Sequence, residues 1–136
     1  MSMIEGNLQQ VRERLVQACR AVGRAPDAVR LLAVSKTFLA DDVRTAWQAG
    51  QRAFGENYVQ EGVDKILALR ALGCTGLEWH CIGPLQSNKT RPVAEHFDWV
   101  HTVDRLKVAQ RLSEQRPAHL PDLQLCVQVN LDGGAN

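Results

Sequence analysis

The chain has 136 residues, of which 45% are hydrophobic and 23% charged, and its sixteen basic and fifteen acidic side chains give a net charge of +1. This length suits one globular domain, so we expect residues 1–136 to form a single domain. The balanced charge argues against a nucleic-acid surface or an anionic-membrane surface. No apolar stretch approaches the ~20 residues that a membrane helix needs.

The N-terminus and the cysteines indicate a cytoplasmic protein. The first fifteen residues are polar and acidic from the start, unlike a signal peptide. Cys19, Cys74, Cys81 and Cys126 are scattered, as free thiols are in a reducing compartment. No Cys-x-x-Cys pair occurs, and the histidines do not fall at zinc-ligand spacing, so we expect no metal site.

The first predicted element is a helix. Apolar residues recur at steps of three and four from Ile4 to Val22, which places them on one helical stripe. Gly23 and Pro26 then end this helix.

Five short apolar or β-branched runs follow and alternate with helical segments. The runs predict strands at 29–34, 52–54, 77–82, 99–103 and 123–129. The first strand is almost continuously hydrophobic, which predicts burial on both faces. Helices are expected between them, and Asp41 or Asp42 and Asp104 are the expected caps of two of these helices.

Strands that alternate with helices indicate parallel βα units in an α/β fold. An open doubly wound sheet and the beginning of a (β/α)8 barrel both fit this pattern. The chain stops soon after the fifth strand, with no helix to cover that strand. We therefore interpret the sequence as the first five strands of a TIM-like barrel, because native proteins avoid uncovered strand edges.

Lys36 is the most distinctive polar residue at the strand ends, where ligands bind in parallel α/β folds. It follows the most hydrophobic strand, so we expect partial desolvation, which favours a neutral amine that can attack an aldehyde. The alternative is a lysine that extends to solvent. Asn57 follows the second strand and suits either a ligand hydroxyl or a turn.

Longer motifs at the strand ends carry a family resemblance. They are Leu31-Leu-Ala-Val-Ser-Lys-Thr37, Phe54-Gly-Glu-Asn-Tyr-Val-Gln-Glu61, Trp79-His-Cys-Ile-Gly-Pro-Leu-Gln-Ser-Asn-Lys89, Val100-His-Thr-Val-Asp-Arg105 and Gln128-Val-Asn130. In this order they resemble the YggS/PROSC family of pyridoxal-phosphate homeostasis proteins. That family has a TIM-like barrel similar to the barrel domain of alanine racemases.

The resemblance implies a site for pyridoxal 5′-phosphate (PLP). By this resemblance Lys36 is the lysine that holds PLP as a Schiff base, and Asn57 lies beside the cofactor ring. The floor of the pocket is expected to include Val34, His80, Ile82 and Gly83.

The chain departs from the family in length, because it ends where the loop after the fifth strand would begin. The remaining strands of the family carry a Ser-x-Gly-Met-Ser stretch and an Arg-x-Gly-Thr stretch, which hold the phosphate and face the pyridine nitrogen. We expect a truncated barrel that binds PLP less tightly than complete members of the family.

The resemblance implies a carrier or regulator of PLP that acts in vitamin B6 and amino-acid balance without catalysis. Its expected partners are PLP and PLP-dependent apoenzymes, and the full-length family is monomeric. One alternative is a PLP-dependent racemase-like enzyme on the same barrel. Another is a barrel fragment without a ligand that self-associates through its open sheet edge.

Overall fold

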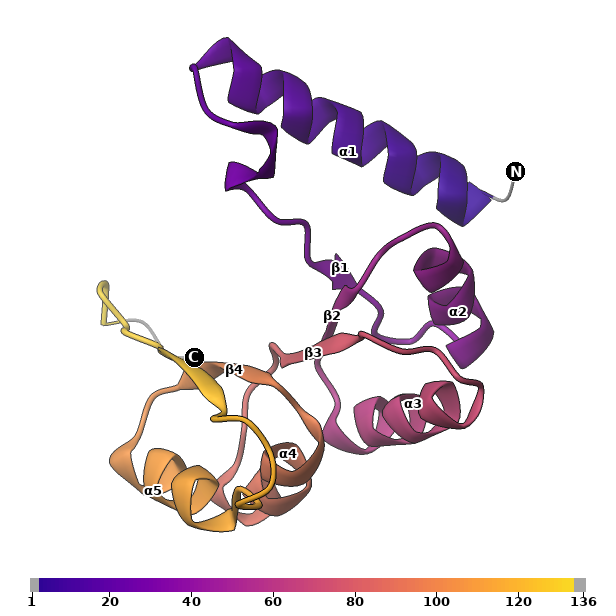
Figure 1. Ribbon diagram of the computed structural model, residues 1–136. Coiled ribbons are helices and arrows are strands. Elements are labelled where there is room, and N and C mark those ends of the chain that lie inside the picture. The colour runs from indigo at the N-terminus through magenta and orange to yellow at the C-terminus, as the bar shows by residue number, and fades with distance from the viewer. Residues whose placement is uncertain (1–2, 134–136) are drawn as a thin grey trace.

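A computed structural model describes residues 3–133 and contains a parallel sheet covered by helices (Figure 1). The helices of this part of the chain are α1 (Met3–Ala21), α2 (Ala40–Gln48), α3 (Val59–Ala71), α4 (Thr90–His96) and α5 (Leu106–Gln115), with short 3-10 turns at Pro26–Ala28 and Ser87–Lys89. The strands are β1 (Ala33–Val34), β2 (Ala53–Glu56), β3 (Glu78–Cys81), β4 (Trp99–Val103) and β5 (Gln124–Val127).

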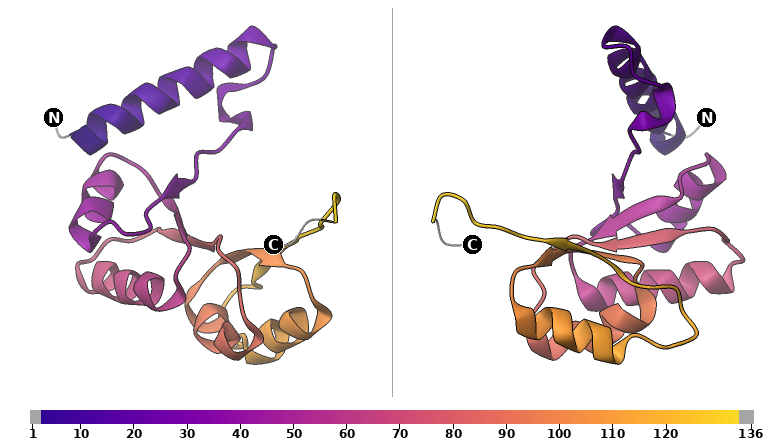
Figure 2. Two further views of the ribbon diagram at one scale, coloured as in Figure 1. Left: turned by 180° about the vertical axis from the view of Figure 1, so that it is seen from behind. Right: turned by 60° about the vertical axis from the view of Figure 1, so that its left-hand side comes forward.

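The strands lie in the order β1-β2-β3-β4-β5, and every neighbouring pair is parallel. Helices α2 to α5 lie on the same side of the sheet, whereas α1 lies beside α2 near the β1 edge (Figure 2). A doubly wound sheet reverses its strand order and carries helices on both faces. The sequential order with one helical layer is that of a TIM-like barrel, so the predicted fold class is confirmed.

The hydrophobic core lies between the sheet and its helices. The register pairs Phe54 with Trp79, and Cys81 with Val100, so these four side chains share the helix-covered face. Each is at most 4% exposed, and the rings of Phe54 and Trp79 lie 5.7 Å apart. Leucine and valine side chains from the helices complete this core, so most of the apolar burial belongs to one face.

The opposite face, here called the inner face, carries a different set of residues. The register aligns Val34 with Gly55, Gly55 with His80, and His80 with Trp99. Val34 is 49% exposed, so the prediction that the first strand is buried on both faces is wrong. Strand β1 pairs only with β2 in the described part of the chain, and no described helix covers this face.

Helix boundaries differ from the predictions at the caps. Helix α2 begins one residue before Asp41, and Asp42 in its first turn accepts the Leu39 N–H at 3.3 Å. Arg105, not Asp104, is the N-cap residue of α5. In both cases an acidic residue lies close to the helix start without serving as the predicted cap residue.

Some predicted core positions are also exposed. Val22, which the predicted stripe of the first helix included, follows the last residue of α1 and is 71% exposed. All four cysteines are free thiols. Within residues 3–133, no helix combines the length and the apolar character required to cross a membrane.

Candidate functional site

The site is built where β1, β2 and β3 end side by side. The Ser35 N–H donates to the Gly55 carbonyl at 2.9 Å, and the Ile82 N–H donates to the Glu56 carbonyl at 3.0 Å. Continuing the β1–β2 and β2–β3 registers places Lys36 level with Asn57, and Asn57 level with Ile82. Three of the residues predicted from sequence are therefore neighbours at the carboxyl edge of the sheet.

Gly83 allows this edge to close tightly. A Cβ atom at this position would lie 2.4 Å from the Asn57 carbonyl oxygen and 2.9 Å from the Asn57 Cα. The Thr102 hydroxyl donates to the Gly83 carbonyl at 2.7 Å and ties the exit of β3 to β4. Glycine is required here because the backbone of the β2 exit occupies the space of a side chain.

Asn57 carries a buried hydrogen-bond acceptor at this edge of the sheet. Its Oδ1 atom is buried and has no hydrogen-bond partner among the described residues. A buried polar atom without a partner costs free energy unless a ligand or water supplies one. The position beside Lys36 and the free acceptor fit a ligand that carries a hydroxyl group.

A tight turn carries Lys36. The Phe38 N–H donates to the Ser35 carbonyl at 3.1 Å, which closes a turn with Lys36 and Thr37 in its middle. Thr37 has a φ of 67°, which is unusual for a β-branched residue. Lys36 itself is exposed, so its predicted desolvation is wrong for this structure. The cause is the open inner face beside β1.

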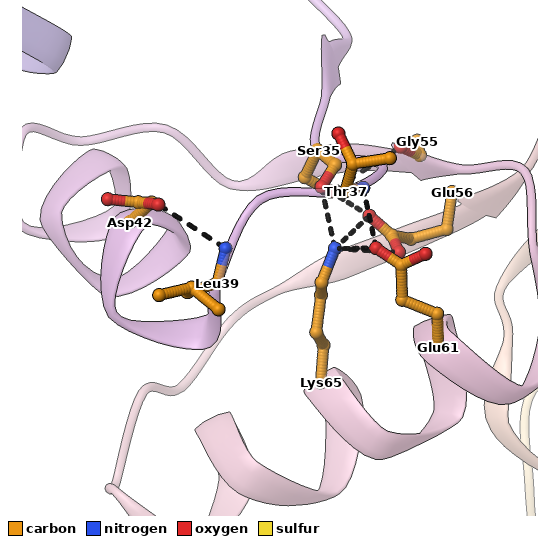
Figure 3. Close-up of polar contacts among 8 residues, drawn as sticks. All are labelled: Ser35, Thr37, Leu39, Asp42, Gly55, Glu56, Glu61 and Lys65. Carbon is orange, nitrogen blue, oxygen red and sulfur yellow. Dashed lines mark hydrogen bonds and ion pairs between the residues drawn. The ribbon is translucent and has the colours of Figure 1, made fainter.

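A buried charged cluster lies directly behind this turn (Figure 3). Lys65 of α3 reaches the β1 exit, where its Nζ lies 2.6 Å from the Ser35 carbonyl, 3.1 Å from Glu56 Oε1 and 2.8 Å from Glu61 Oε1. The Ser35 hydroxyl donates to Glu56, and the Thr37 N–H donates to Glu61 at 2.5 Å. The Lys65 hydrogen bond is the main cause that lowers the pKa of Glu61, so that carboxylate stays ionised.

The inner face holds a second polar group, built around His80. Its Nε2 lies 2.7 Å from Glu78 Oε1, and its Nδ1 lies 2.8 Å from His101 Nε2. The ring stacks on Trp99 with 5.5 Å between centroids. Arg30 donates to the other Glu78 oxygen at 3.0 Å, so a continuous polar chain runs from Arg30 to His101.

Two pKa values on this face are shifted downward, for different reasons. Burial lowers the pKa of His101, and the neighbouring His80 lowers it further. Burial acts to raise the pKa of Glu78, but hydrogen bonds from Arg30 and His80 outweigh it and leave the pKa lowered. The chain therefore favours an ionised Glu78 and a neutral His101.

The neighbouring thiol takes no part in this group. Cys81 follows His80 in the strand and points to the opposite, helix-covered face. Burial raises the pKa of Cys81 to about 11. A thiol in this state is a poor nucleophile, so a Cys–His pair is not available here.

The comparison with protein families matches the model described as "Alanine racemase, N-terminal domain" over residues 4–135. The chain belongs to this family. In this chain the five strands follow one another in sequential parallel order, and Lys36 lies just after β1.

Individual relatives add detail to the family assignment. The chain is 60% identical over 131 residues to the pyridoxal phosphate homeostasis protein of Escherichia coli K12, which is 96% of this chain and 56% of that protein. It is 59% identical over 136 residues to the protein of the same name from Pseudomonas aeruginosa, which is 100% of this chain and 58% of that protein. The chain thus spans little more than half the length of these relatives.

A solved structure supports the same relationship. PipY of Synechococcus elongatus, solved with PLP bound, has a TM-score of 0.73 and 42% sequence identity, and the match covers 89% of this chain and 57% of PipY. This likeness extends to both the fold and the overall sequence.

The residues predicted from sequence fall into two groups in this family member. Lys36, Asn57, Ile82 and Gly83 gather at the exits of β1 to β3. Val34 and His80, the other two predicted residues, lie deeper on the inner face of the sheet.

Sequence reasoning missed the cluster behind Lys36. The structure buries Lys65 between Glu56 and Glu61, and sequence reasoning assigned no role to this lysine. One local signal was present, because Glu61 and Lys65 are four residues apart and therefore adjacent on a helix. The contact with Glu56 joins a helix to a strand and has no equivalent local pattern.

Proposed function

We propose that this protein binds PLP as a Schiff base on Lys36 and acts as a carrier in PLP and amino-acid homeostasis, supplying PLP-dependent apoenzymes. The observation that carries the proposal is the placement of Lys36 and the unpartnered Asn57 Oδ1 at adjacent strand exits. The relatives named as pyridoxal phosphate homeostasis proteins and the PLP-bound PipY structure support it.

The exposed amine of Lys36 supplies the covalent bond. Lys36 would hold PLP through its Nζ, because an amine at this position can condense with an aldehyde. Asn57 Oδ1 accepts a hydrogen bond from a hydroxyl group of the ligand, which satisfies the buried acceptor. When bound, PLP supplies an aldehyde that exchanges reversibly between amines.

The state of the nearby proton-transfer groups supports a role without turnover. Both ring nitrogens of His80 are engaged, one with Glu78 and one with His101. Tyr58, which immediately precedes α3, is 56% exposed. General acid–base catalysis needs a group within hydrogen-bond reach of the transferred proton, and these side chains are committed elsewhere or open to water.

The test is mass spectrometry of the protein after PLP addition and borohydride reduction, followed by peptide mapping. We expect one pyridoxyl adduct, located on Lys36. The Lys36→Ala variant should lose the adduct, while Lys107→Ala, which removes an exposed lysine of α5, should keep it. An adduct distributed over many lysines, or one retained in Lys36→Ala, would contradict the assignment.

A second measurement separates a carrier from an enzyme. The PLP-loaded protein is incubated with alanine in deuterium oxide, and the amino acid is analysed for deuterium at Cα and for the D-enantiomer. We expect neither to accumulate beyond the PLP-only control. Sustained exchange or racemisation would assign racemase-type activity to this chain.

A further inference from the structure

We propose that Lys65, together with Glu56 and Glu61, is a positioning group that holds the turn carrying Lys36. The inference rests on the proposed function, because it assigns a task to residues that surround the PLP-binding lysine. Lys65 does not touch the ligand in this proposal. It acts on the backbone of the two residues next to Lys36.

Both chain neighbours of Lys36 are bound to the cluster. The Ser35 carbonyl accepts from Lys65 Nζ at 2.6 Å, and the Ser35 hydroxyl donates to Glu56. On the other side of Lys36, the Thr37 N–H donates to Glu61 at 2.5 Å. Figure 3 shows these contacts converging from β2 and α3 on the turn. Lys36 is therefore held from both sides while its own side chain stays exposed.

The turn needs such an anchor because of Thr37. Its φ of 67° lies in the left-handed region, which is unfavourable for a β-branched side chain. A residue in this conformation persists only when its surroundings hold it there. The hydrogen bond from its N–H to Glu61 is a direct restraint on the strained residue.

Burying this charged cluster costs desolvation free energy, which an exposed turn would not lose. The side chains of Lys65 and Glu56 are 7% and 0% exposed, and ions at such positions lose most of their hydration. An ammonium has three hydrogens, and Lys65 meets three acceptor groups, namely the Ser35 carbonyl and the two carboxylates. Lys65 is thus fully engaged and is a poor substitute for Lys36 in binding an aldehyde.

The experiment uses Glu61→Ala, which removes the acceptor of the Thr37 N–H. The Glu61 side chain is 31% exposed, so this change leaves Lys65 paired with Glu56 and places the least demand on the fold. We expect the initial rate at which the reducible PLP adduct forms on Lys36 to fall about tenfold. This is the size of effect expected when one strained backbone residue loses the hydrogen bond that restrains it. The thermal midpoint should shift by less than about 4 °C.

Two further variants make the test specific. Adding Thr37→Gly to Glu61→Ala should restore the adduct rate, because glycine adopts a positive φ without strain. Glu114→Ala removes an exposed carboxylate from α5 and should leave the rate unchanged. A role limited to stability would show the reverse pattern, with a lower midpoint, an unchanged rate and no rescue by glycine.

A readout without PLP separates this inference from the proposed function. Amide hydrogen exchange at Thr37 should be about tenfold faster in Glu61→Ala than in the wild type. Unchanged exchange and an unchanged adduct rate would overturn the positioning role. Absence of an adduct on Lys36 in the wild type would overturn the proposed function, and the exchange rates would still decide whether the cluster holds the turn.

Discussion

The two faces of the sheet differ in what they bury. On the helix-covered face, Phe54 and Val100 are 2% and 0% exposed, and they pack into a continuous apolar core. On the inner face, Val34 is 49% exposed, and the polar chain of Glu78, His80 and His101 runs across β3 and β4. Alternation along each strand therefore places the apolar core on one face and the polar chain on the other.

The exception to this division is at the exit of β1. Ser35 and Glu56 point to the helix-covered side, yet they are polar and fully buried. They are satisfied by Lys65 and lie directly behind Lys36. At the exit of β1 the core face is thus polar, and it supports the candidate binding residue there.

The largest expected effect is the loss of a core side chain. Phe54→Ala removes a ring that contacts Trp79 and should lower the free energy of unfolding by about 3–5 kcal/mol. Val34→Ala on the neighbouring strand should cost less than about 1.5 kcal/mol, because this side chain is half exposed. Urea unfolding of both variants measures the contrast, and equal losses would show that the faces do not differ in this way.

A smaller loss of stability is expected where the segment after β3 touches the segment after β2. Gly83→Ala places a methyl group against the Asn57 backbone and should cost about 1–3 kcal/mol. It should also reduce the amount of PLP adduct on Lys36, because Asn57 has to move. Asn88→Ala, an exposed change in the following turn, should alter stability by less than about 0.5 kcal/mol. A Gly83→Ala variant as stable as Asn88→Ala would contradict the close approach.

Much of the fold was predictable because βα units leave a periodic signal. The five apolar runs became five parallel strands, and the sequential order agrees with the predicted barrel. The prediction ended the second strand at Phe54, whereas β2 continues to Glu56. Glycine and glutamate have low β propensity, so sequence alone undervalued the two residues that lead into the site.

The candidate site was predictable in part for a similar reason. Strand ends locate Lys36 and Asn57, because parallel strands bring their carboxyl ends to one edge. The environment of Lys36 was not predictable, because exposure depends on which elements cover the inner face. The Glu56–Lys65 contact joins separate elements, and a single sequence gives no signal for such a pairing.

The smallest expected effect is a difference in pH dependence between the two faces. The pKa of His101 is lowered from 6.5, so below that pH the unfolded chain binds a proton before the folded chain does, and stability falls. The pKa of Glu61 is lowered from 4.5, so its contribution is present above that value and is lost as the pH falls through the lowered pKa.

Unfolding free energies measured between pH 7.5 and 3.5 would separate these steps. His101→Gln should remove the loss that begins below pH 6.5, an effect of less than about 1 kcal/mol because solvent screens the half-exposed ring. Glu61→Gln should leave the loss of stability below pH 6.5 unchanged and should reduce the loss of stability below pH 4.5. If His101→Gln retained the full loss between pH 6.5 and 5, His101 would not be the group that binds the proton, and the pH dependence assigned to its ring would be wrong.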